Sequence, residues 1–246
     1  MKNFWILLVI GIALGYGASV ALNAGTGGST IVSVANVNSP GTNITPGYST
    51  ILVPAVDEDG NGVVTNLTVQ ATPGTGKVLV DINSLVFWID TQNSIRVAGR
   101  VAESASGLRI GNYDITYSIV TNASAVEGPS AGAALTLATI AALEGRRIRS
   151  DVMITGTIEP DGSIGQVGEV LSKAQAAKEL GATLFIVPEG QSFDVERTYE
   201  KKCREFLLSK FCSTEWKSVS MNVSQTAGIS VAEASNIYDA MRLIFE

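Results

Sequence analysis

A serine in the stretch EGPSAGAAL, residues 127–135, is the first residue of this sequence that could do chemistry. Ser130 lies between Gly-Pro and Ala-Gly and precedes a run of small apolar residues, the pattern of a turn that leads into a buried helix. A serine nucleophile needs a base to take its proton. None of the 246 residues is histidine, which excludes Ser-His-Asp and Cys-His catalysis and zinc sites of the His-Glu-x-x-His type. The base must be a carboxylate, a lysine or a tyrosine.

A lysine acts as a base only when it is neutral, and burial among apolar residues lowers its pKa in that direction. Lys173 meets this requirement, because the predicted helix 169–181 places it in an apolar stripe with Val170 and Ala177. Lys178, close to the end of the same helix, is the competing candidate and is expected to be solvated. Periodicity alone leaves open that Lys173 is a surface lysine whose amine reaches solvent.

Three other patterns are misleading. DEDGNG, residues 57–62, begins like a calcium-binding loop, but Thr68 stands where the twelfth ligand should be Glu, and an Asn-Gly hairpin turn explains it better. TPGTGKV, residues 72–78, imitates a phosphate-binding loop but has Ala71 and Val78 where Gly and Ser or Thr are needed. No spacing of Asp and Glu selects a glycosidase pair. We therefore predict neither a metal nor a cofactor.

Composition restricts the class of protein. Apolar residues make up 46% of the chain and charged residues 16%, which is typical of a globular protein and favours a link to membranes. The net charge of −6 argues against a nucleic-acid partner. Cys203 and Cys212 are too few for a cysteine-ligated zinc site, and either a disulfide or two buried thiols would explain them.

The N-terminus predicts the compartment. Residues 4–22 carry no charge over a length that spans a bilayer, so we expect an uncleaved signal anchor, with secretion after signal cleavage as the alternative. Lys2 precedes this segment and the next basic residue is Lys77, which predicts a cytoplasmic N-terminus and an extracytoplasmic domain. Four glycosylation sequons agree with that location: Asn43, Asn66, Asn122 and Asn222.

The remaining pattern predicts one α+β domain over residues 49–246, preceded by a flexible linker at 23–48. Its N-terminal half is β-rich and its C-terminal half alternates helices and strands. We expect strands at 49–56, 62–72, 77–82, 112–121, 152–158 and 183–190, and helices at 130–145, 169–181, 192–211 and 230–245, the last with Ser230 as its N-cap.

Two segments, 127–143 and 149–188, resemble the proteolytic domain of the Lon protease family, whose catalytic pair is Ser-Lys. The family's nucleophile lies in (D/E)-G-P-S-A-G, which this chain matches with Ser130. The resemblance places the family's lysine at Lys173 and the threonine thought to hold that lysine at Thr155. Upstream of these segments, the stretch PGTGK resembles a turn of the same domain.

The resemblance implies a serine endopeptidase that acts on unfolded proteins or peptides. Neutral Lys173 would activate Ser130, backbone N–H groups of Ser130 and Ala131 would hold the oxyanion, and Glu127 would tune the site. Family domains tend to assemble as hexamers, so a homo-oligomer is expected. The alternative is a membrane-anchored protein-binding domain of the same fold whose catalysis has lapsed.

Two departures from the family pattern matter. Gly168 is followed by Glu169, where relatives often carry a second glycine; this carboxylate would raise the pKa of Lys173 if it were close, and we expect it to point outward. No ATPase module accompanies the domain in this sequence, so the resemblance implies peptidase chemistry without ATP-driven unfolding.

Overall fold

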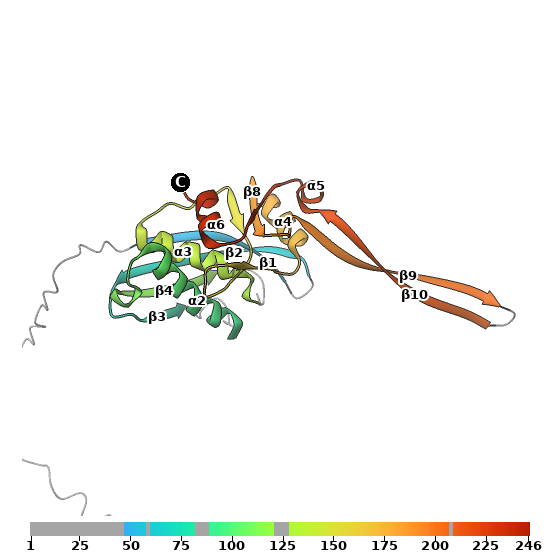
Figure 1. Cartoon of the computed structure of the whole chain (residues 1–246), viewed down its shortest axis with the longest axis horizontal. Coiled ribbons are helices and arrows are strands. Elements are labelled where there is room, and N and C mark those ends of the chain that lie inside the picture. The colour runs from blue at the N-terminus through green and yellow to red at the C-terminus, as the bar shows by residue number, and fades with distance from the viewer. Residues whose placement is uncertain (1–46, 58–59, 82–88, 121–127, 207–208) are drawn as a thin grey trace, which may run out of the picture. The chain divides into compact units, whose positions relative to one another are not determined.

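The computed structural model describes residues 47–57, 60–81, 89–120, 128–206 and 209–246 (Figure 1). All of them belong to the second of two units into which the chain divides, residues 43–246. The predicted signal anchor, most of the linker and Glu127 lie outside the described residues. Within the described ranges, no helix is both long enough and apolar enough to cross a bilayer.

A four-stranded sheet from the first half of the domain carries much of the core. Its strand order is β1-β2-β4-β3, with β3 parallel to β4 and the other neighbours antiparallel. One face is apolar because alternate residues along the strands, such as Ile51 and Val53, are buried. The strands are β1 Gly47–Val56, β2 Gly62–Pro73, β3 Val78–Asp81 and β4 Tyr113–Val120, which confirms the predicted β-rich front.

The turn between β1 and β2 joins two antiparallel strands, which confirms the predicted hairpin. The Asp57 carboxylate accepts from the backbone N–H of Asn61 at 2.8 Å, and the N–H of Gly60 donates to the Asp57 carbonyl. Among the described residues, no group of three or more acidic or Cys side chains is placed to hold a metal ion.

Helix α3, Gly132–Glu144, is buried from its first residue to Leu143. Both of its threonine hydroxyls make hydrogen bonds within the helix: Thr136 donates to the Gly132 carbonyl and Thr139 to the Leu135 carbonyl. The helix ends at Gly145, whose φ of +67° is the left-handed conformation of a C-cap glycine. The predicted buried helix is confirmed.

A second helix packs against α3 where the sequence was expected to form only strands. Helix α2, Ile89–Ser106, buries Ile95, Ala98, Val101 and Ala102 in the main core. These residues recur with helical spacing, a signal that the β-rich interpretation of residues 49–121 missed.

The second half builds a parallel sheet in the order β11-β8-β5. An apolar cluster that includes Met153, Phe185 and Val187 joins this sheet to helix α4. The elements are β5 Val152–Ile154, β8 Leu184–Pro188, β11 Ser230–Ala234, α4 Val170–Glu179, α5 Val223–Ala227, the two-residue strands β6 Thr157–Ile158 and β7 Ile164–Gly165, and the 3-10 turns η1 Ile110–Asn112 and η2 Pro129–Ala131. The mixed helices and strands confirm the α+β class.

The terminal helix is shorter than predicted. Residues 230–234 pair with β8 as β11, and helix α6 covers only Ile237–Ile244. The N-cap is therefore Asn236 and not Ser230, because the Asn236 side chain accepts from two backbone N–H groups of the first turn.

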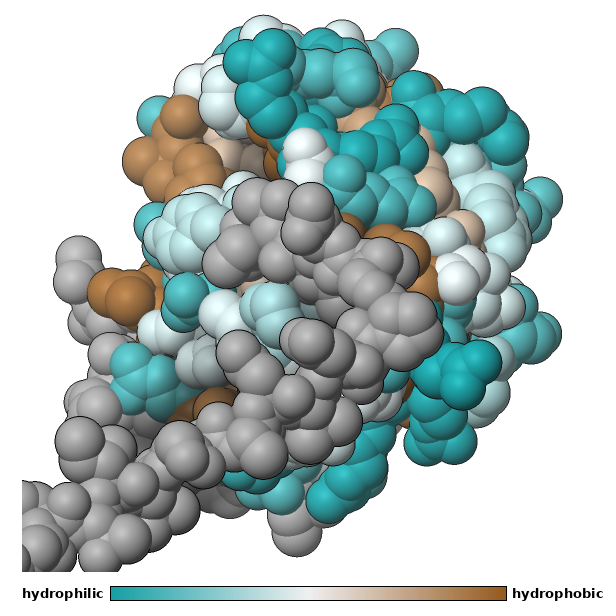
Figure 2. Space-filling view, turned by 90° about the vertical axis from the view of Figure 1, so that its left-hand side faces the viewer, coloured by the Kyte–Doolittle hydropathy of each residue, from teal (hydrophilic) through white to brown (hydrophobic). Residues whose placement is uncertain are grey.

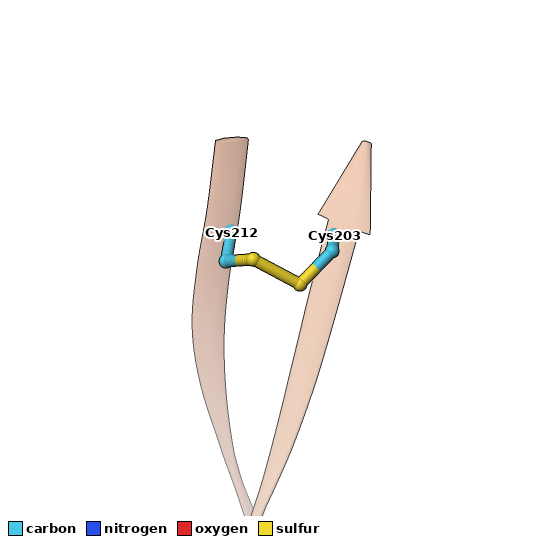
Figure 3. The surroundings of a disulfide bond; sticks show 2 residues. All are labelled: Cys203 and Cys212. Atoms are coloured by element: carbon cyan, nitrogen blue, oxygen red, sulfur yellow. A yellow bond between two sulfur atoms is a disulfide. The ribbon is translucent and has the colours of Figure 1, made fainter. Parts of the chain in front are cut away.

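Residues 193–222 form a long β-hairpin and not the predicted helix. β9 Phe193–Phe206 and β10 Ser209–Asn222 pair antiparallel along their whole length, and Figure 1 shows them extending from the rest of the domain. Cys203 and Cys212 are directly opposite each other and form a disulfide (Figure 3). Of the two explanations for the cysteines, the disulfide is confirmed.

Candidate active site

Ser130 lies on a one-turn 3-10 helix, η2, that leads directly into α3. Gly128 enters the turn with a φ of +98°, which favours glycine, and Pro129 occupies the first position, where a missing N–H costs nothing. Gly132 is required for a different reason: a Cβ there would lie 2.7 Å from the Ile158 backbone nitrogen. The G-P-S-A-G stretch thus presents a half-buried serine at the start of a buried helix.

The Ser130 turn is fastened to the segment that follows β5. The N–H of Gly156 donates to the Ser130 carbonyl at 2.9 Å, and the N–H of Ala133 donates back to the Gly156 carbonyl at 3.0 Å. Thr155 is fully buried, and its hydroxyl donates to the same Ser130 carbonyl at 3.4 Å. Thr155 therefore helps to position the backbone of Ser130. The role expected for Thr155, holding the lysine, did not include this contact.

Lys173 is buried, with only 4% of its surface exposed. Lys173 is the fourth residue of helix α4, and its Nζ donates to the Gly168 carbonyl at 2.9 Å. Burial lowers the pKa of the Lys173 amine below its ordinary value, and the Glu169 carboxylate partly opposes this. Lys178 is exposed, as expected for a solvated lysine. Of the two candidates, Lys173 has the environment that a lysine base needs.

Glu169 stands at the N-cap of α4 in a left-handed conformation, with φ of +57°. Among the described residues, no other non-glycine residue has a positive φ. The family pattern has glycine at this position, according to the resemblance described above, and the backbone here keeps the conformation that glycine favours. The side chain is exposed, as expected, yet its carboxylate is close enough to raise the pKa of Lys173.

Both candidate elements rest on the β1–β2 hairpin. Helix α4 approaches β2 so closely that a Cβ on Gly62 would lie 2.3 Å from the Ser172 carbonyl oxygen. Ser130 lines a small cavity of about 20 Å³ together with apolar residues of β1 and β2, among them Val53, Ala55 and Leu67. A direct hydrogen bond between Ser130 Oγ and Lys173 Nζ stays a prediction.

The PGTGK stretch is a loop between β2 and β3 and not the start of a helix. Its backbone N–H groups at Thr75 and Lys77 both donate to one Asp114 oxygen, at 2.7 and 3.0 Å. These bonds lower the pKa of the Asp114 carboxyl. A carboxylate thus occupies the place that phosphate would take in a nucleotide-binding loop, which supports the rejection of that reading.

Residues 102–219 match the family model of the Lon protease (S16) C-terminal proteolytic domain. The matched region makes up slightly less than half of the chain. It contains Ser130, Thr155 and Lys173. It also contains Glu169, where this chain departs from the family pattern.

The chain is also similar to several Lon proteases over somewhat more than half of its length. "Lon protease 1" of Thermus thermophilus is 29% identical over 143 residues, which are 57% of this chain and 18% of that protein. "Lon protease" of Desulfovibrio desulfuricans is 30% identical over 135 residues, 53% of this chain and 15% of that protein. "Archaeal Lon protease" of Methanothermobacter thermautotrophicus is 28% identical over 149 residues, 59% and 23% respectively. The aligned residues thus span less than a quarter of each relative.

Proposed function

We propose that this chain is a serine endopeptidase in which neutral Lys173 activates Ser130. The observation that carries the proposal is the burial of Lys173, which lowers its pKa, on the helix where the Lon-type pattern has its lysine. Similarity to Lon proteases supports the reaction class.

In the proposed reaction Lys173 Nζ takes the proton from Ser130 Oγ as that oxygen bonds to the scissile carbonyl carbon. The oxyanion is held by the Ser130 and Ala131 N–H groups, because the first N–H groups of a helix have no partner within the helix. The protonated lysine then gives its proton to the leaving amine as the C–N bond breaks. Water, deprotonated by Lys173, releases the acyl group and restores Ser130.

The substrates we propose are unfolded segments or peptides, cleaved without ATP. The apolar cavity beside Ser130 is about the size of one small group, so it favours a small apolar side chain next to the scissile carbonyl over a charged one. Glu127 is proposed to tune the site, and assembly into a homo-oligomer is part of the same proposal.

We further propose that residues 4–22 anchor the chain in a membrane, with the peptidase domain outside the cytoplasm. The disulfide supports this location, because disulfides persist in oxidising compartments. Protease added to intact cells should then cleave the domain, and full protection would overturn the placement.

The dyad is tested by cleavage of casein and a peptide series by the full chain without nucleotide. We expect Ser130→Ala and Lys173→Ala each to lose at least about 100-fold in kcat/KM. Lys178→Ala, an exposed lysine on the same helix, should keep wild-type activity. Equal activity in all variants would overturn the mechanism.

A second candidate is a membrane-anchored protein-binding domain without catalysis. The observation that favours it is the hydrogen bond that ties Lys173 Nζ to the Gly168 carbonyl, which a lapsed site could retain for stability alone. This candidate predicts no Ser130-dependent cleavage of any peptide, together with retained capture of unfolded polypeptide by Ser130→Ala.

A further inference from the structure

The distal half of the β9–β10 hairpin is exposed, and the proposed peptidase reaction uses none of its residues. Every side chain described from Tyr199 through Ser220 is exposed. Large apolar side chains are among them: Tyr199 is 67% exposed, Phe211 66% and Trp216 71%. Isolated two-stranded hairpins are only marginally stable in water, so a hairpin of 14-residue strands with such residues is expected to have a partner surface.

The aromatic residues are organised. Tyr199 and Trp216 are directly paired across the strands, and their rings meet edge to face at 5.7 Å. Cys203 and Cys212 lie on the same face, since they are an even number of residues from that pair. The opposite face carries two ion pairs, Lys202–Glu215 and Lys217–Glu200, both at 2.6 Å. The distal hairpin therefore has a face with aromatic side chains and a disulfide, and a face with ion pairs.

Basic residues gather at the same end. The stretch KKCREFLLSKFC, residues 201–212, contains Lys201, Lys202, Arg204 and Lys210 but a single acid, in a chain whose net charge is −6. Tyr199, Lys201, Lys210 and Trp216 lie on the face of the disulfide, together with Glu205 opposite Lys210, and are called the distal surface below. Arg204 and Phe211 are paired with each other on the opposite face. Figure 2 shows the end of the domain that lies away from the hairpin, where hydrophilic residues predominate and the hydrophobic ones form separate small patches.

We infer that the distal surface docks on an anionic lipid bilayer. Tyr and Trp, with an apolar ring and a polar group, favour the membrane–water interface. The lysines beside them are attracted to anionic headgroups, while the acidic remainder of the chain is repelled. A second copy fits less well, because a two-fold contact would bring two basic surfaces together.

The segment between the proposed anchor and the domain is longer than the hairpin. The inference uses the membrane anchoring proposed for residues 4–22 and not the peptidase chemistry. Strands of 14 residues are about 45 Å long. The 24 residues between position 22 and the start of β1 reach at most about 80 Å when extended, which exceeds the length of the hairpin.

Trp216 can report the docking directly. The chain has three tryptophans, and Trp5→Phe with Trp88→Phe leaves Trp216 alone. The full chain is combined with vesicles of phosphatidylcholine, with or without 30% phosphatidylglycerol, that contain lipids brominated near the headgroup. We expect quenching and a blue shift of Trp216 emission in the anionic vesicles.

Matched charge variants test whether the basic residues of the distal surface cause the docking. Lys201→Gln with Lys210→Gln should lower the equilibrium constant for docking, by about fivefold per lysine and about 25-fold together. Arg96→Gln with Arg100→Gln, which removes two exposed charges from α2, should leave quenching unchanged. Flotation of the vesicles reports the anchor separately.

Three results would overturn the inference. The first is flotation without Trp216 quenching, which would leave the anchor intact. The second is quenching that ignores both phosphatidylglycerol and the lysine variants. The third is shielding of Trp216 from acrylamide without lipid quenching, which would mean that a second copy or a polypeptide covers the surface.

Discussion

Lys173 Nζ donates a hydrogen bond to the carbonyl of Gly168, the residue that precedes the N-cap of the lysine's own helix. A carbonyl accepts from a neutral or a charged amine, so this bond holds the lysine in place without requiring its charge. The nearby carboxylate of Glu169 acts in the other direction and favours the charged form. Burial is the larger effect, which leaves the pKa of Lys173 lowered.

Glu169→Gln should shift the pH dependence of activity. Removing the carboxylate removes the effect that raises the Lys173 pKa, so the pKa should fall further and the rise of kcat/KM with pH should move to lower pH. The pH profile is measured with a neutral peptide substrate. Glu179→Gln, at the other end of α4, is the control, and an identical shift in both variants would contradict the assignment.

Lys173→Met should abolish cleavage and raise the free energy of unfolding at neutral pH. A lowered pKa in the folded state means that the unfolded chain binds more protons between that pKa and the ordinary lysine value. Wild-type stability therefore rises with pH across this window, and the advantage of Met should shrink over the same window. The lost hydrogen bond to Gly168 offsets about 1 kcal/mol. Denaturant melts at several pH values measure it, and a pH-independent difference would contradict burial of an ionisable amine.

Glu169→Gly should stabilise the fold by up to about 1 kcal/mol. A non-glycine residue with φ of +57° costs about 1–2 kcal/mol, of which the greater freedom of glycine in the unfolded chain cancels part. Glu179→Gly removes the same side chain from a right-handed helical position and should destabilise by about 0.5–1 kcal/mol. Thermal unfolding of the two variants should shift in opposite directions, and a fall in both would contradict strain at Glu169.

Gly132→Ala should destabilise the fold and reduce activity, although alanine is the better helix former. Its Cβ would meet the Ile158 backbone nitrogen at 2.7 Å and the Ile158 Cγ2 at 2.8 Å, forcing a shift of the turn that carries Ser130. Such overpacking costs about 1–3 kcal/mol. Gly99→Ala in α2, where the nearest atom lies at an ordinary 3.6 Å, should instead stabilise by up to about 1 kcal/mol. Equal effects at the two sites would contradict the close approach.

The sequence predicted the elements around the site because their patterns are local. The helix after Ser130 is apolar on every side and ends in glycine, so it was identified without tertiary information. The apolar stripe made Lys173 a candidate base, and the resemblance to the family pattern selected it. The pairing of Thr155 with the Ser130 carbonyl depends on how β5 meets η2, and no local pattern reports it.

Two elements were predicted wrongly, each for a different reason. Buried residues of helix α2 recur with helical spacing from Ile95 to Ala102. The strand patterns on either side favoured a β-rich prediction, and this helix was missed. The segment from Phe193 to Phe206 is rich in Glu, Lys and Arg, which favour helices, yet it pairs with a strand containing Val, Thr and Trp. Cross-strand pairing, closed by the disulfide, overrides the propensity of one strand.

Replacing both cysteines, Cys203→Ser with Cys212→Ser, should loosen the hairpin while sparing the peptidase site. The disulfide joins directly opposed residues nine apart in sequence, and closing a loop of this size removes about 2–3 kcal/mol of unfolded-chain entropy. We expect faster amide hydrogen exchange in β9 and β10 and unchanged exchange in α3 and α4, because only the base of the hairpin contacts the helix that carries Lys173, where the N–H of Leu171 donates to Asp194. Peptide cleavage should keep its wild-type kcat/KM. Loss of protection in α4, or of cleavage, would show instead that the disulfide stabilises the catalytic helix through Asp194.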